Sequence, residues 1–404
     1  MPEAVIVATA RTPIGRAFKG SFAEERADDM AAFIVDAVLN KVPELDRHSI
    51  EDLVLGCGLP GGEQGFNMGR VVAILAGMPT VPGTTITRYC SSSLQSLRMV
   101  AHAVKAGEGD AFIAAGVEAV SRFMVGGSSD HTPNTQNPRF ADAAIRSAER
   151  MAGGQGTWTP PEGMPDVYIA MGETAENVAA LEGVSREAMD EFAVRSQNRA
   201  GAAIERGFFE REITPYTLSN GTVVTSDDCP RPGTELTKLA SLSPVFRPDG
   251  LVTAGNACPL NDGASAVIVM SDTRAAELGI TPLARIVSSG VTGLDPEIMG
   301  LGPIEASRQA LARAGMTIDD VDLVEINEAF AAQVLPSAEA LGIDLDKLNV
   351  NGGAIALGHP FGMTGARIMT TLLNGLEDAD KTIGLETMCV GGGQGMAMIV
   401  ERLS

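Results

Sequence analysis

Thr84-Thr85-Ile86-Thr87-Arg88-Tyr89-Cys90-Ser91-Ser92-Ser93-Leu94 is the stretch that decides the fold, because it predicts a short strand that turns directly into a helix. Its first four residues are β-branched, which suits a strand. After the turn, apolar residues recur at spacings of three and four and predict one apolar helix face: Leu94, Leu97, Ala101 and Val104. Cys90 then lies at a helix N-terminus, where backbone N–H groups and the helix dipole favour a thiolate. The alternative is a buried structural cysteine.

Charge and composition exclude several classes of partner. The 404 residues include 30 basic and 51 acidic ones, a net charge of −21, and no basic cluster stands out. Nucleic acid and anionic membranes are therefore not expected partners. A few arginines and helix N-termini would still suffice to bind an anionic substrate.

The cysteines and histidines predict neither a disulfide framework nor a metal site. The five cysteines are widely spaced without a CxxC pair, and the four histidines form no HExxH-like pattern. No apolar segment approaches the roughly 18 residues that a membrane helix needs, and the N-terminus does not read as a signal peptide. We expect no membrane insertion and a reducing cytoplasmic location.

Alternating strand and helix patterns predict an α/β fold with an internal duplication. In the first part, strands are expected at 4–9, at the end of the segment 49–55, at 84–87 and at 110–116. The last third repeats this order, with strands expected at 283–287, 317–324, near 348–350, at 382–388 and at 396–400. We therefore predict an N-terminal half, 1–121 completed by 249–272, and a C-terminal half, 273–404.

The segment 122–248 differs in character and is predicted to be an inserted loop domain. It opens with the polar run Gly126-Gly127-Ser128-Ser129-Asp130 and contains the only tryptophan, Trp158. It then becomes helical, at 173–181 and from Ser185, a good N-cap, to about Gly207.

Four segments place a reactive or polar residue where a strand meets a turn: Tyr89-Cys90-Ser91, Glu325–Phe330, Gly358-His359-Pro360 and Met388–Gly393. Each has a plain alternative, in which His359 is a turn histidine, Asn327 a helix cap and Cys389 a buried strand residue. A dinucleotide loop at 391–395 is rejected, because the chain ends one strand later and leaves no room for a Rossmann unit.

Together these segments resemble the thiolase family over essentially the whole chain. Further matching stretches are Arg11–Gly15, Gly172–Asn177, Thr253–Asn256, Leu260–Ala264, Asn327–Phe330 and Asn351–Pro360. The resemblance implies a thiolase fold, a duplicated five-layered α-β-α-β-α core with an inserted loop domain. It also implies a homodimer or homotetramer that needs no cofactor or metal beyond its substrate, coenzyme A.

The resemblance also implies the catalytic roles. Cys90 would attack the 3-keto carbon of a 3-ketoacyl-CoA and hold the shortened acyl chain as a thioester. His359 would take the Cys90 proton, and Cys389 would be the second acid and base. His359 and a water held by Asn327 would form one oxyanion hole, and the N–H groups of Cys90 and Gly391 the other.

The same resemblance implies a CoA and substrate path. Its residues would be Arg231, Phe246, Ala254, Ala257, Cys258, Leu260, Ala329, Phe330 and Met171. Cys258 departs from the serine of many thiolases, and a thiol makes only weak hydrogen bonds. Ala170 replaces the histidine of the Tyr-His-Met-Gly string of acetoacetyl-CoA thiolases. This smaller residue, together with the 125–165 loop, favours a substrate other than, or larger than, acetoacetyl-CoA.

The leading interpretation is a 3-ketoacyl-CoA thiolase that degrades acyl-CoA thioesters. An acetoacetyl-CoA thiolase that condenses two acetyl-CoA molecules is the alternative. A β-ketoacyl synthase would use a second histidine or asparagine in place of the thiol base Cys389. A non-catalytic acyl- or lipid-binding relative should have lost part of the set Cys90, Asn327, His359 and Cys389, which is complete here.

Overall fold

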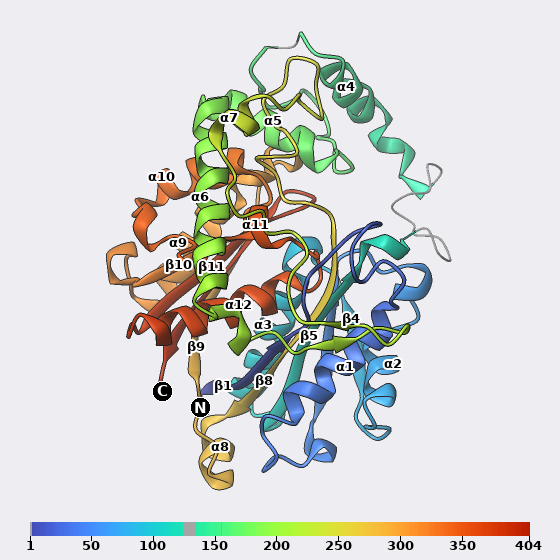
Figure 1. Ribbon diagram of the computed structural model, residues 1–404, viewed down its shortest axis with the longest axis vertical. Coiled ribbons are helices and arrows are strands. Elements are labelled where there is room, and N and C mark those ends of the chain that lie inside the picture. Colours follow the sequence, from blue (N-terminus) through green and yellow to red (C-terminus); the bar gives the residue numbers. More distant parts are fainter. Residues whose placement is uncertain (1, 124–134, 155) are drawn as a thin grey trace.

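The computed structural model describes residues 2–123, 135–154 and 156–404, so the predicted polar run at 126–130 lies outside the described residues. The described chain forms a ten-stranded mixed sheet in the order β10-β11-β12-β9-β1-β8-β5-β3-β4, with the short β2 paired to β8. Only two residue pairs join β1 to β9, Val5 with Arg285 and Ile6 with Ala284. The sheet therefore divides naturally into two parts at this narrow junction (Figure 1).

The first part of the sheet contains residues from both ends of the N-terminal half. Its strands are β1 (Ala4–Arg11), β2 (Gly15–Arg16), β3 (Asp52–Cys57), β4 (Gly83–Ile86), β5 (Ala111–Ala119) and β8 (Asn261–Ser271). Its helices are α1 (Ala27–Leu39), α2 (Met68–Leu75), α3 (Ser92–Ala106) and α8 (Asp272–Leu278). Strand β8 lies between β1 and β5. The exact domain bounds given above stay a prediction.

The second part repeats the pairing pattern of the first. Its strands are β9 (Ala284–Gly293), β10 (Leu323–Ile326), β11 (Ile383–Val390) and β12 (Gln394–Arg402). Its helices are α9 (Gly302–Ala314), α10 (Ala331–Leu341), α11 (Ala354–Leu357) and α12 (Thr364–Asp378). The pairs β1–β8, β8–β5 and β5–β3 are antiparallel, antiparallel and parallel, and the pairs β9–β12, β12–β11 and β11–β10 follow the same sequence. The predicted duplication is thus visible in the sheet itself.

The strand predicted near 348–350 is wrong, and a side chain explains the difference. Where β4 pairs with β3 in the first part, the second has only a single parallel bridge between Val324 and Leu348. Asn349 adopts a left-handed conformation, with φ of 46°, which ends the extended chain. Its side-chain amide accepts from the N–H of Ile326 and donates to the C=O of Ile326, both at 2.9 Å. The side chain therefore takes the place of a backbone ladder.

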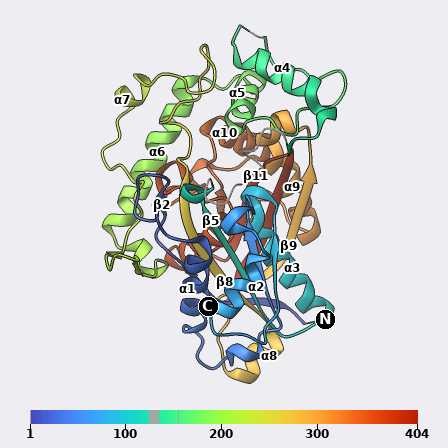
Figure 2. The ribbon, with the colours of Figure 1, turned by 90° about the vertical axis from the view of Figure 1, so that its right-hand side faces the viewer.

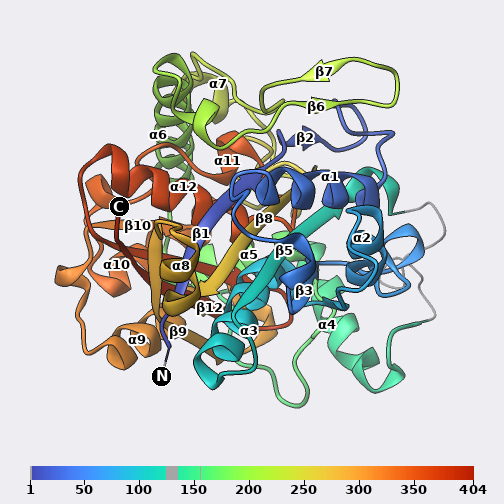
Figure 3. The ribbon, with the colours of Figure 1, turned by 90° about the horizontal axis from the view of Figure 1, so that it is seen from below.

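Three apolar clusters pack the helices and strands into five layers, and the central one surrounds the middle layer of helices. In β3, Leu53 and Leu55 face the cluster under α1 and α2, whereas Val54 faces the cluster around α3 and α12. The central cluster continues onto β12 through Met396 and Met398, and a third cluster packs α9 and α10 on the other face of that strand. Figure 3 shows α1 and α3 on opposite sides of β1, β8 and β5. Helices α3 and α12 therefore form the middle layer.

The segment between β5 and β8 gathers largely at one end of the molecule. Its elements are α4 (Ala141–Met151), α5 (Met171–Glu182), α6 (Arg186–Glu205), β6 (Tyr216–Thr217), β7 (Val223–Val224) and α7 (Leu236–Ala240). Helices α5 and α6 agree with the prediction, and Ser185 caps α6 by accepting from the N–H of Ala188. Helix α4 was not predicted. Figure 2 shows α4, α5 and α7 far from both termini.

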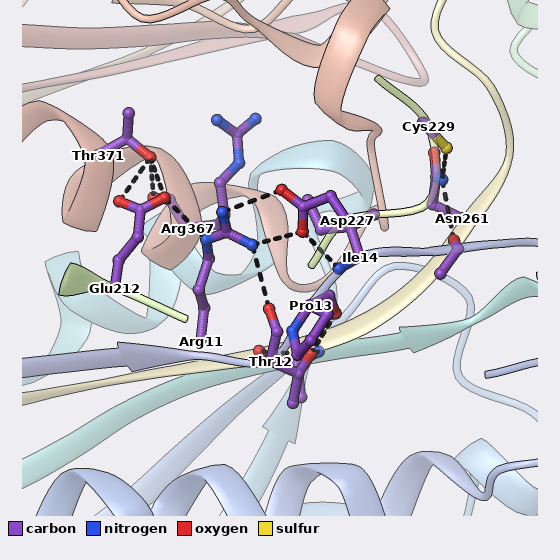
Figure 4. Close-up of polar contacts among 12 residues, drawn as sticks. Arg11, Thr12, Pro13, Ile14, Glu212, Asp227, Cys229, Asn261, Arg367 and Thr371 are labelled. Atoms are coloured by element: carbon purple, nitrogen blue, oxygen red, sulfur yellow. Dashed lines mark hydrogen bonds and ion pairs between the residues drawn. The ribbon is translucent and has the colours of Figure 1, made fainter. Parts of the chain in front are cut away.

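A buried ion-pair cluster ties this segment to the core. Arg11, at the end of β1, is fully buried and pairs with Glu212 at 2.8 Å and with Asp227 at 2.7 Å (Figure 4). Asp227 also accepts from the N–H of Ile14. Removing Arg11 would leave two buried carboxylates without their cation, and breaking a buried ion pair in this way costs about 3–5 kcal/mol. No helix among the described residues is both long and apolar enough to cross a membrane.

Candidate active site

Cys90 lies in a short 3-10 turn, Tyr89–Ser91, between β4 and α3, as predicted. Only 7% of its surface is exposed, and it lines a cavity of about 360 Å³. The turn is held by its own hydroxyls, since Ser92 Oγ donates to the C=O of Tyr89 and accepts from the N–H of Arg88. The backbone N–H groups of Gly391 and Cys90 lie near the Cys90 thiol and act to lower its pKa.

Gly391 comes from a hairpin in the other half of the chain. Strands β11 and β12 pair up to Val390 and Gln394, and Gly391–Gly393 form the turn. Gly393 has a φ of 80°, and a Cβ there would lie 2.3 Å from the C=O of Leu294, so only glycine fits. The hairpin confirms that the glycine run is not a dinucleotide loop.

Cys389, the last residue but one of β11, is fully buried next to the same turn. Burial raises the pKa of its thiol well above the usual value, and the thiols of Cys90 and Cys258 act in the same direction. Three thiols from three distant segments therefore lie close enough to influence one another. All five cysteines are free.

His359 is fixed by side chains at both ring nitrogens. Its Nδ1 lies 2.6 Å from Thr364 Oγ1, and its Nε2 lies 3.2 Å from Asn327 Nδ2. Thr364 uses its hydroxyl hydrogen to donate to the C=O of Pro360, so its oxygen accepts from an Nδ1–H. The lone pair of the ring then belongs to Nε2. Asn327 does not cap a helix, because α10 begins after Phe330.

The resting site holds a neutral imidazole and a thiol. Burial, followed by the charge of Arg367, lowers the pKa of His359 to about 3. Burial raises the pKa of Cys90 to about 12, although the N–H groups of Gly391 and Cys90 lower it. The expectation that the helix N-terminus stabilises a resting thiolate is therefore wrong in its net direction, because desolvation outweighs the backbone donors.

One buried carboxylate connects the loops around the site. Glu118 Oε2 accepts from the N–H groups of Gly58 and Gly362, at 2.7 and 2.8 Å, and Oε1 accepts from Leu59 N–H at 3.2 Å. Burial raises the pKa of Glu118 to about 7. Leu59 lines the cavity, and so does Phe361, whose ring packs edge-on against His359 with centroids 5.1 Å apart.

The cavity beside Cys90 has a largely apolar wall. Besides Cys90 and Gly391 it is lined by Leu59, Tyr89, Val167, Tyr168, Ile169, Ala170, Met171 and Phe361, with Thr135, Gln136 and Gly392. Its volume lies within the range of small-molecule sites. Of the predicted substrate residues, Met171 lines this cavity. Ala170, the position at which the sequence departs from the acetoacetyl-CoA pattern, lines it too.

Three other predicted substrate residues line a second, smaller cavity of about 50 Å³. They are Arg231, Ala254 and Ala257, and Cys229 lies beside them. Ala257 bridges to Phe330, and the N–H of Cys258 donates to the C=O of Ala329.

The remaining two predicted substrate residues are Phe246 and Leu260. Phe246 packs edge-on against Phe330, with centroids 6.2 Å apart. Leu260 is 49% exposed and lines neither of these two cavities.

Sequence reasoning missed two residues that position His359. Thr364 contacts the ring, and Asn261 Oδ1 accepts from the N–H of His359 at 2.8 Å. Asn261 Nδ2 donates to the C=O of Gly15 and lies 3.1 Å from Cys229 Sγ (Figure 4). Asn261 belongs to Leu260–Ala264, one of the stretches that carry the family resemblance. No local sequence pattern linked it to His359, which lies 98 positions further along the chain.

A buried cysteine beside backbone donors and a second thiol suits acyl transfer through a thioester. Comparison with known proteins agrees with this class. The chain matches the family models "Thiolase, N-terminal domain" over residues 4–273 and "Thiolase, C-terminal domain" over 280–402. The chain belongs to the thiolase family, a family of acyltransferases, and the predicted fold class is confirmed.

Similar proteins cover the chain from end to end. A 3-ketoacyl-CoA thiolase of Saccharophagus degradans is 43% identical over 99% of this chain and 98% of its own length. One from Pseudoalteromonas translucida is 44% identical over the whole of both chains. The crystal structure of the Bacillus anthracis acetyl-CoA acetyltransferase superposes with a TM-score of 0.87, at 36% identity over 100% of this chain and 99% of that one.

Proposed function

We infer that the protein is a 3-ketoacyl-CoA thiolase, which uses CoA to cleave a 3-ketoacyl-CoA into acetyl-CoA and a shortened acyl-CoA. The observation that carries this conclusion is the meeting of Cys90, Gly391 and Cys389 from distant segments beside one apolar cavity. Relatives with this name match the full chain. Degradation of fatty acyl thioesters is the corresponding metabolic role.

In the proposed first half-reaction, the Cys90 sulfur attacks the 3-keto carbon while its proton passes to Nε2 of His359. Proton transfer accompanies attack, since both groups are neutral at rest. The bond between C2 and C3 then breaks, and the acetyl-CoA carbanion takes a proton from Cys389. The acyl group remains on Cys90 as a thioester.

In the second half-reaction, Cys389 removes the thiol proton of incoming CoA, and the CoA sulfur attacks the acyl-enzyme. Cys90 leaves as the thiolate and is reprotonated by His359. We propose that the N–H groups of Cys90 and Gly391, which act to lower the pKa of the resting Cys90 thiol, receive the thioester oxygen. Losing one such donor costs about 3–4 kcal/mol of transition-state stabilisation. The role of Asn327 in a second oxyanion hole stays a prediction.

We propose that the substrate is larger than acetoacetyl-CoA. Ala170, Leu59, Val167 and Phe361 give the cavity apolar surface next to Cys90, and no large side chain at 170 fills it. We further propose a path for the nucleotide end of CoA past Arg231, Ala254 and Ala257 in the second cavity. The proposed reaction uses CoA as substrate and no other cofactor.

The test is thiolysis with free CoA across 3-ketoacyl-CoAs from acetoacetyl to long-chain and bulky acyl groups, measured as loss of the 3-keto thioester and gain of acetyl-CoA. We expect kcat/KM to rise with acyl size and Cys90→Ala to be inactive but folded. Activity confined to acetoacetyl-CoA would favour the alternative, an acetoacetyl-CoA thiolase; the structurally similar Bacillus anthracis protein is an acetyl-CoA acetyltransferase. If none of these 3-ketoacyl-CoAs were cleaved, the proposed thiolase activity would be contradicted.

The cellular location and the oligomeric state are further parts of the proposal. We propose a cytoplasmic location, supported by five free cysteines, which persist in a reducing compartment. We also propose a homodimer or homotetramer. Size-exclusion chromatography with light scattering measures the second point, and a monomer at assay concentration would contradict it.

A further inference from the structure

A third cavity lies apart from the active site, and basic residues line it. It has a volume of about 340 Å³ and lies between α3, β9 and the last turn of α9. Four of its lining residues are basic: Arg98, His102 and Lys105 from α3, and Arg313 from α9. None of the residues that line it is acidic. It shares no lining residue with the cavity beside Cys90.

Two of these basic residues have a structural explanation and two do not. Lys105 Nζ donates to the C=O of Ile286 at 2.8 Å, and Arg313 donates to the C=O of Ser289 at 2.6 Å. Both also lie in the last turn of a helix, where a cation suits the dipole. Arg98 and His102 lie earlier in α3. The Nε of Arg98 is buried with no hydrogen-bond partner among the described residues.

Among the described residues, no carboxylate lines this cavity or acts on the pKa of Arg98 or His102. Burial lowers the pKa of Arg98, and the charges of Arg88 and Arg313 lower it further. Burial also lowers the pKa of His102, followed by the charges of Arg98, Lys105 and Arg313. Every charged group that shifts these two residues is a cation. Although the net charge of the protein is −21, basic side chains repel one another in this cavity. This repulsion destabilises the folded state, and a bound anion would relieve it.

We propose that this cavity is a binding site for a multiply charged phosphate anion, either free polyphosphate or the phosphate chain of a nucleotide. Three permanent cations call for a ligand with more than one negative charge. Guanidinium groups match phosphate oxygens with paired, charge-assisted hydrogen bonds. The volume is about eleven times the roughly 30 Å³ of a water molecule, so the cavity holds a larger group than a single chloride ion.

The experiment is isothermal titration calorimetry of the full-length protein with sodium pyrophosphate, at fixed ionic strength and with sodium chloride as the blank. We expect saturable binding, and we expect Arg98→Gln and Arg313→Gln each to weaken it about tenfold or more, as the loss of a charge-assisted bond implies. Arg308→Gln is the matched control, because Arg308 lies on α9 and pairs with Glu305 outside the cavity. Its affinity should equal that of the wild type.

Arg231→Gln separates this site from the proposed CoA path, since phosphate could bind there as well. Unchanged pyrophosphate affinity in that variant is expected. Any one of three results would overturn the proposal. Arg231→Gln could lose its pyrophosphate affinity, Arg98→Gln and Arg313→Gln could keep the wild-type affinity, or the wild type could give no saturable heat. If Arg98→Gln does not fold, Arg313→Gln carries the test.

Titration with ADP then identifies the source of the phosphate. Tighter binding than pyrophosphate supports a nucleotide, and equal binding supports free polyphosphate. None of these titrations depends on thiolase activity, so they test the cavity independently of the proposed function.

Discussion

Replacing Thr364 by valine should disable His359 without touching any reacting atom. Valine keeps the shape but removes the oxygen that lies 2.6 Å from Nδ1 of the buried ring. A buried N–H without an acceptor costs about 1–3 kcal/mol. The ring can avoid this cost by moving its proton to Nε2, because Asn327 has a buried Oδ1 with no partner among the described residues and can rotate to accept it.

The shifted proton would occupy the nitrogen that has to accept the Cys90 proton. We therefore expect the acylation rate to fall by about 5- to 150-fold, which is the range that 1–3 kcal/mol corresponds to. The assay is a single-turnover measurement of acyl-enzyme formation with excess enzyme and a 3-ketoacyl-CoA. Alkylation of Cys90 by iodoacetamide provides a second readout of the same base.

Thr364→Ser is the matched control, because it keeps the hydroxyl and loses only a methyl group. It should acylate within about twofold of the wild type while showing similar or lower thermal stability. The reasoning fails if valine and serine at position 364 give equal acylation rates. It also fails if the valine variant loses stability but keeps its rate.

Three other predictions concern pH, packing and specificity. Since the pKa of His359 is lowered to about 3, its imidazole stays neutral over the usual assay range. Alkylation of Cys90 should then show no inflection near pH 6.5, and a histidine inflection there would contradict the burial argument. Gly116→Ala places a Cβ 2.0 Å from the C=O of Gly362, in the loop that follows His359. We expect the variant to unfold at a lower denaturant concentration and, because this loop shifts, to lose kcat on the order of a hundredfold. An unchanged kcat would refute this prediction. Ala170→Phe fills the cavity wall and should lower kcat/KM for long 3-ketoacyl-CoAs more than for acetoacetyl-CoA; equal losses for both would show that the acyl chain lies elsewhere.

Local patterns predicted the elements of this fold well because each obeys its own periodicity. The apolar stripe of α3 and its stop at Gly107, which has a φ of 75°, were both readable from the residues. The strand near 348 was not, because a side chain replaced the backbone in pairing. Asn349 could have signalled this, since asparagine tolerates the left-handed region and its side-chain amide, like the backbone, can both donate and accept hydrogen bonds.

The assembly of the site depended on contacts that no local pattern contains. Cys90 and Gly391 are brought together by the order of strands across both halves, and only the family resemblance anticipated their meeting. Thr364 and Asn261 were missed because each acts through His359. The protonation states were missed because burial decides them: residues near a helix N-terminus indicate a lowered thiol pKa, whereas the enclosed site raises it.

The middle layer explains why the site forms where it does. Helices α3 and α12 meet at their first turns, since the N–H of Ala366 donates to Ser93 Oγ at 2.9 Å. Both N-termini thus face the region of Cys90. A helix terminus contributes about 0.3–2 kcal/mol to a nearby negative charge. The pKa of Cys90 rises from 9.0 to about 12 on burial, which corresponds to roughly 4 kcal/mol. The contribution of two helix ends is therefore too small to offset the burial of the Cys90 thiol. We propose that their contribution acts instead on the negative charge that develops on the substrate oxygen during attack, which would favour the transition state over the resting enzyme.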